Sequence, residues 1–390
     1  MLMRKIIINT TPQRFVVSVP NNFSLEEILK LNDLPPSLFQ GYIEDQKKIV
    51  PIPLNIKIAY IDQKYKIIIQ CIRNTDLRQI FPQKKQYYRI KNPLLTKKEI
   101  YFKNHKCYQK VIEINENIAK KSVFEIVNSF VNKNSIEKLI IAGVSGGGDS
   151  NTLVESLTKI NNKKYIFFTL VFDPIWPSKA AKRAQELYSK TNSKHLILYP
   201  QKVEKILKFK NTLDSTYNIF CKYFGTDKSH FFATYLISLV ARKLCKQYKT
   251  TEYCLGYNKE DVFAELLFTI INGKRPLSYP IRKFGKYTLL MPLYEIPKKI
   301  LDACYPKYSI DNYQERMDTT THQRSMIYYL SHCIEDIPGN INIDIMNGLA
   351  NIFQNKWNNL KFQKHGELYF IENANTENKK KIDKFLEEIF

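Results

Sequence analysis

The hydrophobic and polar positions of residues 122–305 predict strands that alternate with helices. Lys138–Val144 and the run YIFFTLVF, which ends at Phe172, are short and continuously apolar, as strands buried on both faces are. A helix is expected across Ser178–Lys190, and the runs HLILY and TEYCLGY predict further strands. Strands and helices that alternate at these lengths indicate an α/β fold with a doubly wound parallel sheet. Beyond Pro306 the pattern is mainly helical.

The first 83 residues follow a different pattern, of short strands around one helix. Ser24 is placed to cap a helix over SLEEILKLNDL, which carries two glutamates in its first turn. The order of these elements is similar to that of a ubiquitin-type β-grasp module, and a small α+β adaptor of another lineage is the alternative. The expected strands are Lys5–Asn9, Phe15–Pro20, Tyr42–Glu44, Lys57–Ile61 and Tyr65–Ile72.

Residues 84–121 differ from both neighbours in their charge. Eleven lysines and arginines stand here against three glutamates, with five tyrosine or phenylalanine residues among them. Cations bind phosphates and aromatic rings stack on bases, so this segment is expected either to bind RNA or to form a solvated linker. The predicted divisions are an α+β module at 1–83, the basic linker at 84–121, the α/β domain at 122–305 and a helical region at 306–390.

The composition of the 390-residue chain limits the partners and the cellular compartment that we expect for it. The net charge of +23 and the pI near 9.5 favour acidic partners such as nucleotides or nucleic acid, although an AT-rich genome also produces an excess of lysine. No apolar run reaches the roughly 20 residues of a spanning helix, and the N-terminus turns polar too soon for a secretory signal. Seven scattered cysteines form no C-x-x-C pair, so we expect reduced thiols, a cytoplasmic location and no cysteine-based metal site.

The stretch LIIAGVSGGGDSNTLVESL, residues 139–157, carries the clearest chemical signal. A predicted buried strand runs into the hexapeptide S-G-G-G-D-S, residues 145–150, and a helix follows. The glycines allow a sharp turn and a close approach of the backbone to a ligand. Backbone N–H groups and the start of the helix form a concave site of partial positive charge, to which the two serines add hydroxyl donors. The loop is therefore expected to hold phosphate oxygens.

An acidic residue distinguishes this loop from an ordinary nucleotide-binding loop. From Gly143 the sequence reads G-x-x-x-x-G-D-S, whereas a Walker A loop has a lysine where Asp149 stands. A carboxylate beside a phosphate is repelled unless a cation lies between them. We therefore expect Mg²⁺ to bridge Asp149 and the phosphates, which disfavours simple transfer of the terminal phosphoryl group.

The strand followed by S-G-G-x-D-S resembles the PP-loop of the N-type ATP pyrophosphatase superfamily (adenine nucleotide alpha hydrolase-like). This superfamily includes GMP synthetase, asparagine synthetase, lysidine synthetase and the tRNA thiolation enzymes. The resemblance covers about residues 135–353 and is nearest to the tRNA 2-thiolation and lysidine branch. It implies a HUP-like PP-loop domain that cleaves ATP between its α and β phosphates, transfers AMP to a substrate oxygen, and lets a nucleophile displace the AMP.

Later segments match this branch only in part. The run LGYNKEDVFAE is similar to the family's G-H-x-x-D-D-x-x-E-T segment, with Tyr257 in place of the His, Glu260 in place of the first Asp, and Asp261 matching the second. The paired cysteines of the thiolation enzymes are missing, and Cys221 stands alone in that region as either a persulfide carrier or a packed thiol. The missing pair, and a faint similarity of DKSHFFAT to a run in sugar amidotransferases, favour a nitrogen nucleophile.

The resemblance implies ATP and Mg²⁺ at the site and assigns roles to individual residues. Asp149 and Asp261 are expected to be catalytic and to hold the metal. The adenine is expected beside the ends of the first two strands, near the backbone of Phe172 and close to Asp173, while Trp176 either stacks on a substrate or caps the sheet. The expected nucleotide-binding residues are Ser145, Gly146, Gly147, Gly148, Asp149, Ser150, Phe172, Asp173 and Gly256.

Three functions stay open on the sequence alone. The first is an adenylating ligase or transferase, including chemistry like that of the 7-deazaguanine synthases, which forms AMP and pyrophosphate and uses a nitrogen nucleophile. The second is a tRNA-modifying enzyme of the thiolation or lysidine type, and the third a nucleotide-binding protein without turnover. The acceptor is a small molecule, a protein or a tRNA, and a homodimer is an open option.

Overall fold

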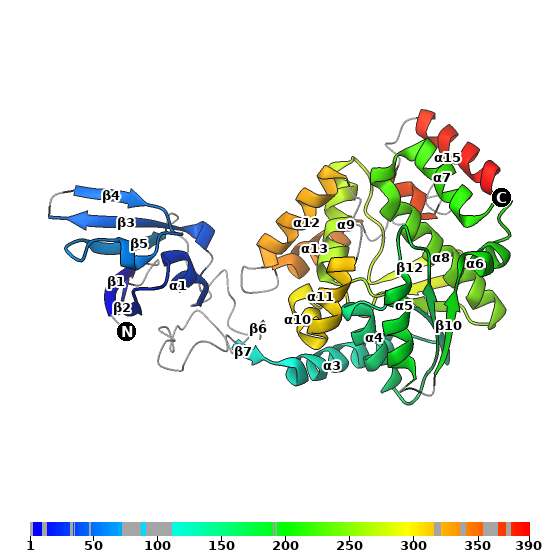
Figure 1. Cartoon of the computed structure of the whole chain (residues 1–390), viewed down its shortest axis with the longest axis horizontal. Helices are drawn as coiled ribbons and strands as arrows, with labels where there is room; N and C mark the ends of the chain where they lie inside the picture. The colour runs from blue at the N-terminus through cyan, green and yellow to red at the C-terminus, as the bar shows by residue number, and fades with distance from the viewer. Residues whose placement is uncertain are drawn as a thin grey trace. The chain divides into compact units, whose positions relative to one another are not determined.

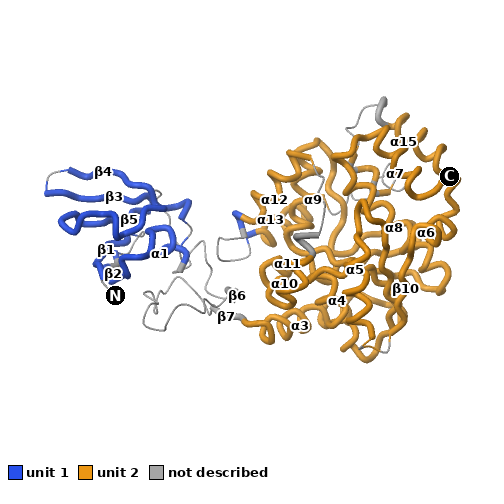
Figure 2. The backbone as a smooth tube through the Cα atoms, in the orientation of Figure 1, with its two compact units in different colours: residues 1–114, 333–341 blue, residues 115–332, 342–390 orange. Residues whose placement is uncertain are grey.

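The computed structural model divides the chain into two compact units, which Figure 2 shows in different colours. The first unit comprises residues 1–114 and 333–341, and the second comprises 115–332 and 342–390. The structure describes residues 3–9, 14–31, 34, 36–46, 48–71, 87–90, 111–189, 191, 193–315, 321–335, 341–353, 366–371 and 376–390. No helix in these described ranges is long and apolar enough to cross a membrane.

The first unit is built on a five-stranded sheet in the order β2-β1-β5-β3-β4. The central strands β1 and β5 are parallel, and every other pair is antiparallel. This order and the parallel central pair confirm the predicted ubiquitin-type β-grasp. The elements, whose helices and strands Figure 1 labels, are β1 (Met3–Asn9), β2 (Arg14–Pro20), α1 (Leu25–Leu31), η1 (Pro36–Leu38), β3 (Phe39–Asp45), β4 (Lys48–Ile52), η2 (Ile58–Tyr60) and β5 (Lys66–Cys71).

The helix α1 covers one face of this sheet and completes a core of aliphatic side chains. Ser24 caps the helix as predicted: its hydroxyl accepts the N–H of Glu27 at 3.1 Å, and the Glu27 carboxylate accepts the N–H of Ser24 at 2.6 Å. The strand predicted at Lys57–Ile61 is wrong, because the chain there forms the short 3₁₀ helix η2. Ile58 and Ile61 are both buried, and their spacing of three fits that helix rather than a strand.

Most of the basic segment predicted at 84–121 lies outside the described residues. Within it the structure describes β6 (Tyr87–Ile90) and β7 (Val111–Ile114), which pair in parallel, and the beginning of α3. RNA binding by this segment, and the four-part division of the chain, therefore stay predictions.

The second unit contains a six-stranded sheet in the order β10-β9-β8-β11-β13-β12. All neighbours are parallel except the edge strand β12, which runs antiparallel to β13. The doubly wound parallel α/β fold is therefore confirmed. Its strands are β8 (Leu139–Gly143), β9 (Lys164–Leu170), β10 (Lys194–Leu198), β11 (Glu252–Cys254), β12 (Ile281–Phe284) and β13 (Tyr287–Leu290).

The order of the strands reverses beside β8, and this reversal places helices on both faces. The chain steps from β8 to β9 to β10 in one direction and then crosses back to β11. Right-handed crossovers in opposite directions put α4 and α5 on one face and α8 on the other. The helices of this unit are α3 (Glu116–Asn134), α4 (Gly148–Thr158), α5 (Ser178–Tyr188), α6 (Pro200–Leu207), α7 (Leu213–Phe224), η4 (Thr226–Lys228), α8 (Ser229–Gln247) and α9 (Lys259–Ile271).

The chain after β13 is helical, as predicted, and packs back on this unit. The hydroxyl of Tyr328 donates to the start of α9, and Phe385 packs its ring against Phe220 and Phe224 of α7. The elements are α10 (Lys298–Cys304), α11 (Pro306–Glu315), α12 (His322–Glu335), α13 (Ile341–Phe353), η6 (Gly366–Phe370) and α15 (Thr376–Ile389).

A buried carboxylate joins β11 to the turn that precedes β8. Glu252 is 3% exposed and accepts hydrogen bonds from the Ser135 hydroxyl at 2.5 Å, the Ile136 N–H at 3.0 Å and the Glu137 N–H at 3.3 Å. Charge-assisted hydrogen bonds of this kind are stronger than neutral ones. Glu252 therefore fixes the register in which the first central strand enters the sheet.

We expect Glu252→Ala to lower the free energy of unfolding of the second unit by about 2 kcal/mol, because three donors lose their common acceptor. Glu252→Gln keeps one acceptor oxygen and should lose less. Urea unfolding followed by tryptophan fluorescence reports on this unit, since both tryptophans, Trp176 and Trp357, follow residue 115. The exposed Glu186→Ala is the control and should change the free energy by less than about 0.5 kcal/mol. An equal effect of the two alanine variants would contradict this role.

Candidate active site

The loop between β8 and α4 turns its peptide groups in a fixed direction. The carbonyl of Gly146 accepts the side-chain amide of Asn151 at 3.0 Å and the Arg183 guanidinium at 3.3 Å. Both of these donors are buried, so this carbonyl is held on the protein side of the loop. The first N–H groups of α4 have no intrahelical acceptor, and Gly147 at the N-cap offers them no side chain. The loop thus forms a donor-rich wall at the start of a helix.

Two glycines of the loop are required by close approach. Gly146 has φ +82°, and a Cβ there would lie 1.8 Å from the carbonyl oxygen of Ala180 in α5. A Cβ on Gly148 would lie 2.1 Å from the hydroxyl of Ser309 in α11. The loop is therefore pressed between two helices that come from distant parts of the sequence.

The serines of the loop face each other across its mouth. The hydroxyl oxygens of Ser145 and Ser150 are 3.3 Å apart, and Ser150 also donates to the carbonyl of Gly147 at 3.0 Å. Both serines line a cavity of about 730 Å³, together with Asp149 and Gly256. Of the predicted loop residues, Ser145, Asp149 and Ser150 line this cavity, whereas Gly146, Gly147 and Gly148 are not among its lining residues.

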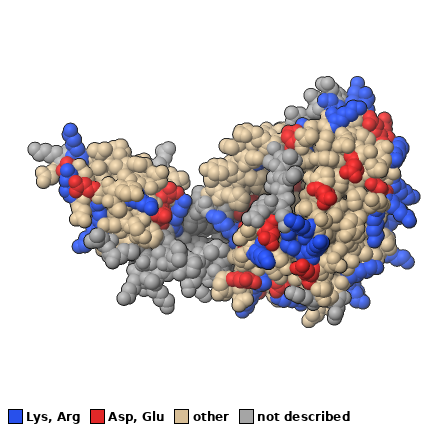
Figure 3. Space-filling model, in the orientation of Figure 1, with Lys and Arg blue, Asp and Glu red and all other residues tan. Residues whose placement is uncertain are grey.

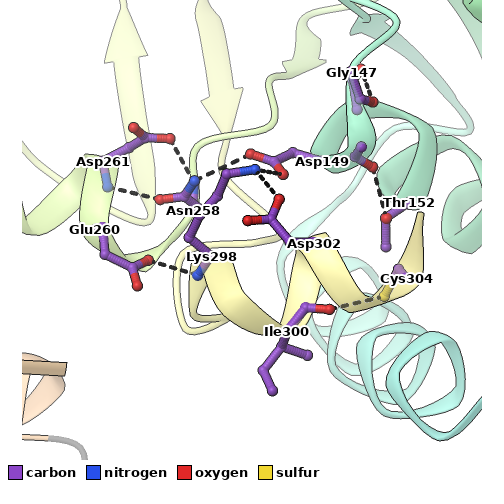
Figure 4. Close-up of polar contacts among 12 residues, drawn as sticks. Gly147, Asp149, Thr152, Asn258, Glu260, Asp261, Lys298, Ile300, Asp302 and Cys304 are labelled. Atoms are coloured by element: carbon purple, nitrogen blue, oxygen red, sulfur yellow. Dashed lines mark hydrogen bonds and ion pairs between the residues drawn. The ribbon is translucent and has the colours of Figure 1, made fainter. Parts of the chain in front are cut away.

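Asp149, in the first turn of α4, is held by an ion pair. One carboxylate oxygen, Oδ1, lies 2.5 Å from the ammonium of Lys298 at the start of α10, and the other, Oδ2, accepts the side-chain amide of Asn258 at 3.3 Å. The same ammonium lies 2.6 Å from the carboxylate of Asp302, one turn along α10. Figure 4 shows Lys298 between the two carboxylates. Neither Lys298 nor Asn258 was expected from the sequence.

The pKa values of Asp149 and Lys298 are shifted by burial and by the charge of the other residue. Burial raises the pKa of Asp149, and the neighbouring Lys298 opposes that shift. Burial lowers the pKa of Lys298, but Asp149 and Asp302 outweigh it and raise that pKa above its usual value. Lys298 is therefore an ammonium throughout the physiological range, and it faces the loop with a full positive charge.

Asp261 lines the same cavity but is committed to other partners. It forms a capping box with Asn258, whose N–H donates to Asp261 Oδ2 at 3.2 Å and whose side chain accepts the Asp261 N–H at 2.9 Å. The other oxygen of Asp261 accepts the hydroxyl of Tyr328 in α12 at 2.8 Å. Asp261 therefore positions Asn258, and through it Asp149, while its own oxygens are already hydrogen-bonded.

The carboxylates of this cavity suit a magnesium ion that is bound together with a triphosphate. They suit less well a metal ion that is held by protein side chains alone. No cluster of three or more His, Cys, Asp or Glu side chains suited to a metal occurs in the part of the chain that the structure describes. Mg²⁺ in nucleotide sites is usually held by one or two carboxylates, with phosphates and waters completing its shell. Asp149 can supply that carboxylate and Asp302 shares its ammonium partner. Each oxygen of Asp261 accepts one hydrogen bond and keeps a second lone pair, so the metal role expected for Asp261 stays a prediction.

The turn after β9 uses its own backbone groups to close on itself, and adenine binding near Phe172 and Asp173 stays a prediction. Phe172 is 2% exposed, its N–H donates to the carbonyl of Trp176 at 3.0 Å, and its carbonyl accepts the N–H groups of Ile175 and Trp176. The backbone of Phe172 therefore has no free group for an adenine. Pro174, Ile175 and Trp176 line the cavity, while Phe172 and Asp173 are not among its lining residues. An adenine at this end would contact the turn itself.

Cys221 lies on α7 and is not among the residues that line the cavity. Burial raises the pKa of its thiol, and a hydrogen bond with Tyr217 only partly opposes this. A thiol with a raised pKa is a poor nucleophile. Among the cavity-lining residues in the described ranges there is no cysteine, whereas His230, Tyr328 and Arg324 take part in the wall opposite the loop.

The chain has no match among family models and no significant match among characterised protein sequences. Solved structures similar to it include the U34-tRNA thiolase NcsA from Methanococcus maripaludis with its 4Fe-4S cluster, at 15% identity and TM-score 0.49 over 67% of this chain and 86% of that one. NMN synthetase from Francisella tularensis is similar at 13% identity and TM-score 0.36, over 63% of this chain and 98% of that one.

The NH3-dependent NAD synthetase from Campylobacter jejuni is similar at 13% identity and TM-score 0.33, over 64% of this chain and 96% of that one. These three proteins are members of the superfamily that the loop resembles. At these identities and TM-scores the similarities carry no argument about function, which is argued below from the residues of the chain itself.

We expect Gly146→Ala to weaken ATP binding by about 100-fold, because its Cβ would push the loop off Ala180 by an ångström or more. Gly285→Ala is the matched control: it also has a positive φ, of +60°, but its Cβ would meet nothing within 4 Å. Isothermal titration with ATP should show unchanged affinity for the control. Equal losses in the two variants would mean that backbone strain, rather than the contact with α5, is responsible.

Proposed function

We propose that this protein is a PP-loop ATP pyrophosphatase, which transfers AMP to an oxygen of an acceptor for displacement by a nitrogen nucleophile. The observation that carries the proposal is the placement of Asp149. An acid stands where a phosphoryl-transfer loop has its lysine, and a lysine from α10 lies 2.5 Å from that acid. The cation that a triphosphate needs is therefore offered at the loop from another part of the chain.

The reaction would begin with the triphosphate across the loop. An acceptor oxygen attacks the α-phosphorus, the bond between this phosphorus and the α,β-bridging oxygen breaks, and pyrophosphate leaves with the electron pair. The N–H groups at the start of α4 and the Lys298 ammonium stabilise the charge that grows on the leaving group. Mg²⁺, when bound, would supply additional positive charge to the same oxygens.

The second step would take place in the same cavity. A nitrogen nucleophile attacks the carbon that bears the adenylated oxygen, AMP leaves, and the nitrogen gives up its proton. Glu260 lines the cavity, where one carboxylate oxygen accepts the backbone N–H of Lys298 at 2.9 Å and the other lies 3.8 Å from the His332 ring, and Tyr328 of α12 also lines it. Such groups can orient an acceptor and accept a proton. No side chain of the chain is required to form a covalent intermediate.

A tRNA-modifying enzyme is the second candidate, since the chain carries a net charge of +23. Figure 3 shows lysine and arginine gathered at several places over one face, with aspartate and glutamate among them. Thiolation is the less favoured form of this candidate because the cavity wall lacks a described cysteine. A lysidine-like reaction needs only a nitrogen nucleophile and stays compatible with the cavity.

We expect incubation with ATP, Mg²⁺ and a fractionated cell extract to yield AMP and pyrophosphate in equal amounts, measured by ion-exchange chromatography. Asp149→Asn should lower the rate by about 100-fold or more, because the charge that balances Lys298 is lost. The exposed Asp214→Asn on α7 is the control and should leave the rate unchanged. Release of ADP and orthophosphate would contradict the proposal, and tight ATP binding without turnover in any fraction would favour a nucleotide-binding protein.

Filter binding with total tRNA separates the two enzymatic candidates. If tRNA is the acceptor, affinity should fall by roughly 10³-fold or more between 50 and 200 mM salt, since phosphate contacts release counterions. An acceptor that is a small molecule predicts weak binding at physiological salt. Saturable binding in that range that is also improved by ATP would favour the tRNA candidate over the small-molecule one.

A further inference from the structure

Lys298 occupies a position that helix electrostatics disfavour. It is the first residue of α10, where the helix dipole carries partial positive charge and repels a cation. Its partner Asp302 follows at i+4, and a lysine N-terminal to its acid is the less favourable order for such a pair. Local stability therefore does not explain the lysine. Its 2.5 Å contact with Asp149, 149 residues earlier in the sequence, indicates a role in the cavity.

The charges around Lys298 do not suit a triphosphate until a further cation is added. Two carboxylates, Asp149 and Asp302, share one ammonium, and a third, Glu260, accepts the backbone N–H of Lys298 at 2.9 Å, so the groups around Lys298 carry an excess of negative charge. A divalent cation offsets that excess, which would otherwise repel phosphate oxygens. Without a metal ion, the charges at this site therefore do not favour a triphosphate.

A metal ion at Asp149 would meet an ammonium that already contacts the same carboxylate. Oδ2 accepts the Asn258 amide at 3.3 Å, and Oδ1 is in contact with Lys298 at 2.5 Å. A magnesium ion lies about 2.1 Å from a carboxylate oxygen, so the two cations on Oδ1 would repel each other strongly. Asp302 offers the ammonium a second partner at 2.6 Å without a change of helix.

Resting on the function proposed above, we propose that Asp149 exchanges one cation for another when the nucleotide binds. Lys298 occupies Asp149 in the empty site, gives up that oxygen to Mg²⁺, and stays in the cavity on Asp302, where it binds the phosphate oxygens that leave as pyrophosphate. The exchange is what frees Lys298 for the catalytic role proposed above. Asp302 is a positioning residue, which keeps the ammonium within reach during the exchange.

The exchange can be tested by metal binding alone, without turnover. Mn²⁺ is the probe, and its free concentration is read from the electron paramagnetic resonance signal of the aqueous ion. Lys298→Met should bind Mn²⁺ about tenfold more tightly than the wild type, because the competing ammonium is gone. Asp302→Asn should bind Mn²⁺ more weakly than the wild type, because the ammonium then rests on Asp149 alone. The neighbouring Lys299→Met removes the same charge from an exposed position and should change nothing.

The nucleotide is tested separately with α,β-methylene ATP, which cannot be cleaved at the bond in question. In the presence of Mn²⁺, both Lys298→Met and Asp302→Asn should bind this analogue about tenfold more weakly, because each loses the ammonium or its support. The two variants thus move metal affinity in opposite directions and nucleotide affinity in the same direction. Circular dichroism checks that each variant is folded. Lys298→Gln is a second neutral substitution, in case Lys298→Met does not fold.

Two different results distinguish failure of the exchange from failure of the proposed function. If the wild type binds the analogue but Lys298→Met and Lys298→Gln bind Mn²⁺ no more tightly than it does, the exchange is wrong while the nucleotide site stands. If neither the wild type nor any variant binds the analogue, the proposed function itself is wrong.

Discussion

The crossover from β10 back to β11 is the constraint on which the rest of the second unit depends. Because the chain leaves β8 in one direction and β11 in the other, the loops after these two strands diverge at the carboxyl edge of the sheet. The divergence leaves a space bordered by the start of α4 and the start of α9. Asp149 and Asn258 meet across it at 3.3 Å only because their strands are neighbours.

The charges in this space come from three separate parts of the sequence. The acid lies on α4, its amide partner on the turn before α9, and its cation on α10. Asp261 gives this arrangement rigidity, since it caps α9 through Asn258 and holds Tyr328 of α12 with its other oxygen. The polar network therefore runs without a break from the glycine loop to the opposite wall, and a change at either end is felt through hydrogen bonds rather than through bulk packing.

The sequence was informative where the cause of a structure is local. The run from Leu139 to Leu157 contains the strand, the turn and the helix start together, so the loop and Asp149 could be predicted. Lys298 could not, because its pairing depends on the packing of α10 against α4. The spacing of Asn258 and Asp261 is a capping signature that the sequence contains, and it accounts for a structural role of Asp261 beside its predicted role as a metal ligand. The internal hydrogen bonds of Phe172 in the turn after β9 could not be predicted either, because they depend on how the turn closes on Trp176.

The contact of Ser309 with Gly148 has a consequence for the order of events during synthesis. The glycine loop leaves the ribosome long before α11 and α12, yet these later helices press on the loop and wall the cavity. Domains are made from the N-terminus onward, so the parallel strands can pair while the pocket is still open on one side. A nascent chain therefore contains the glycine loop before the helices that complete the cavity have been made.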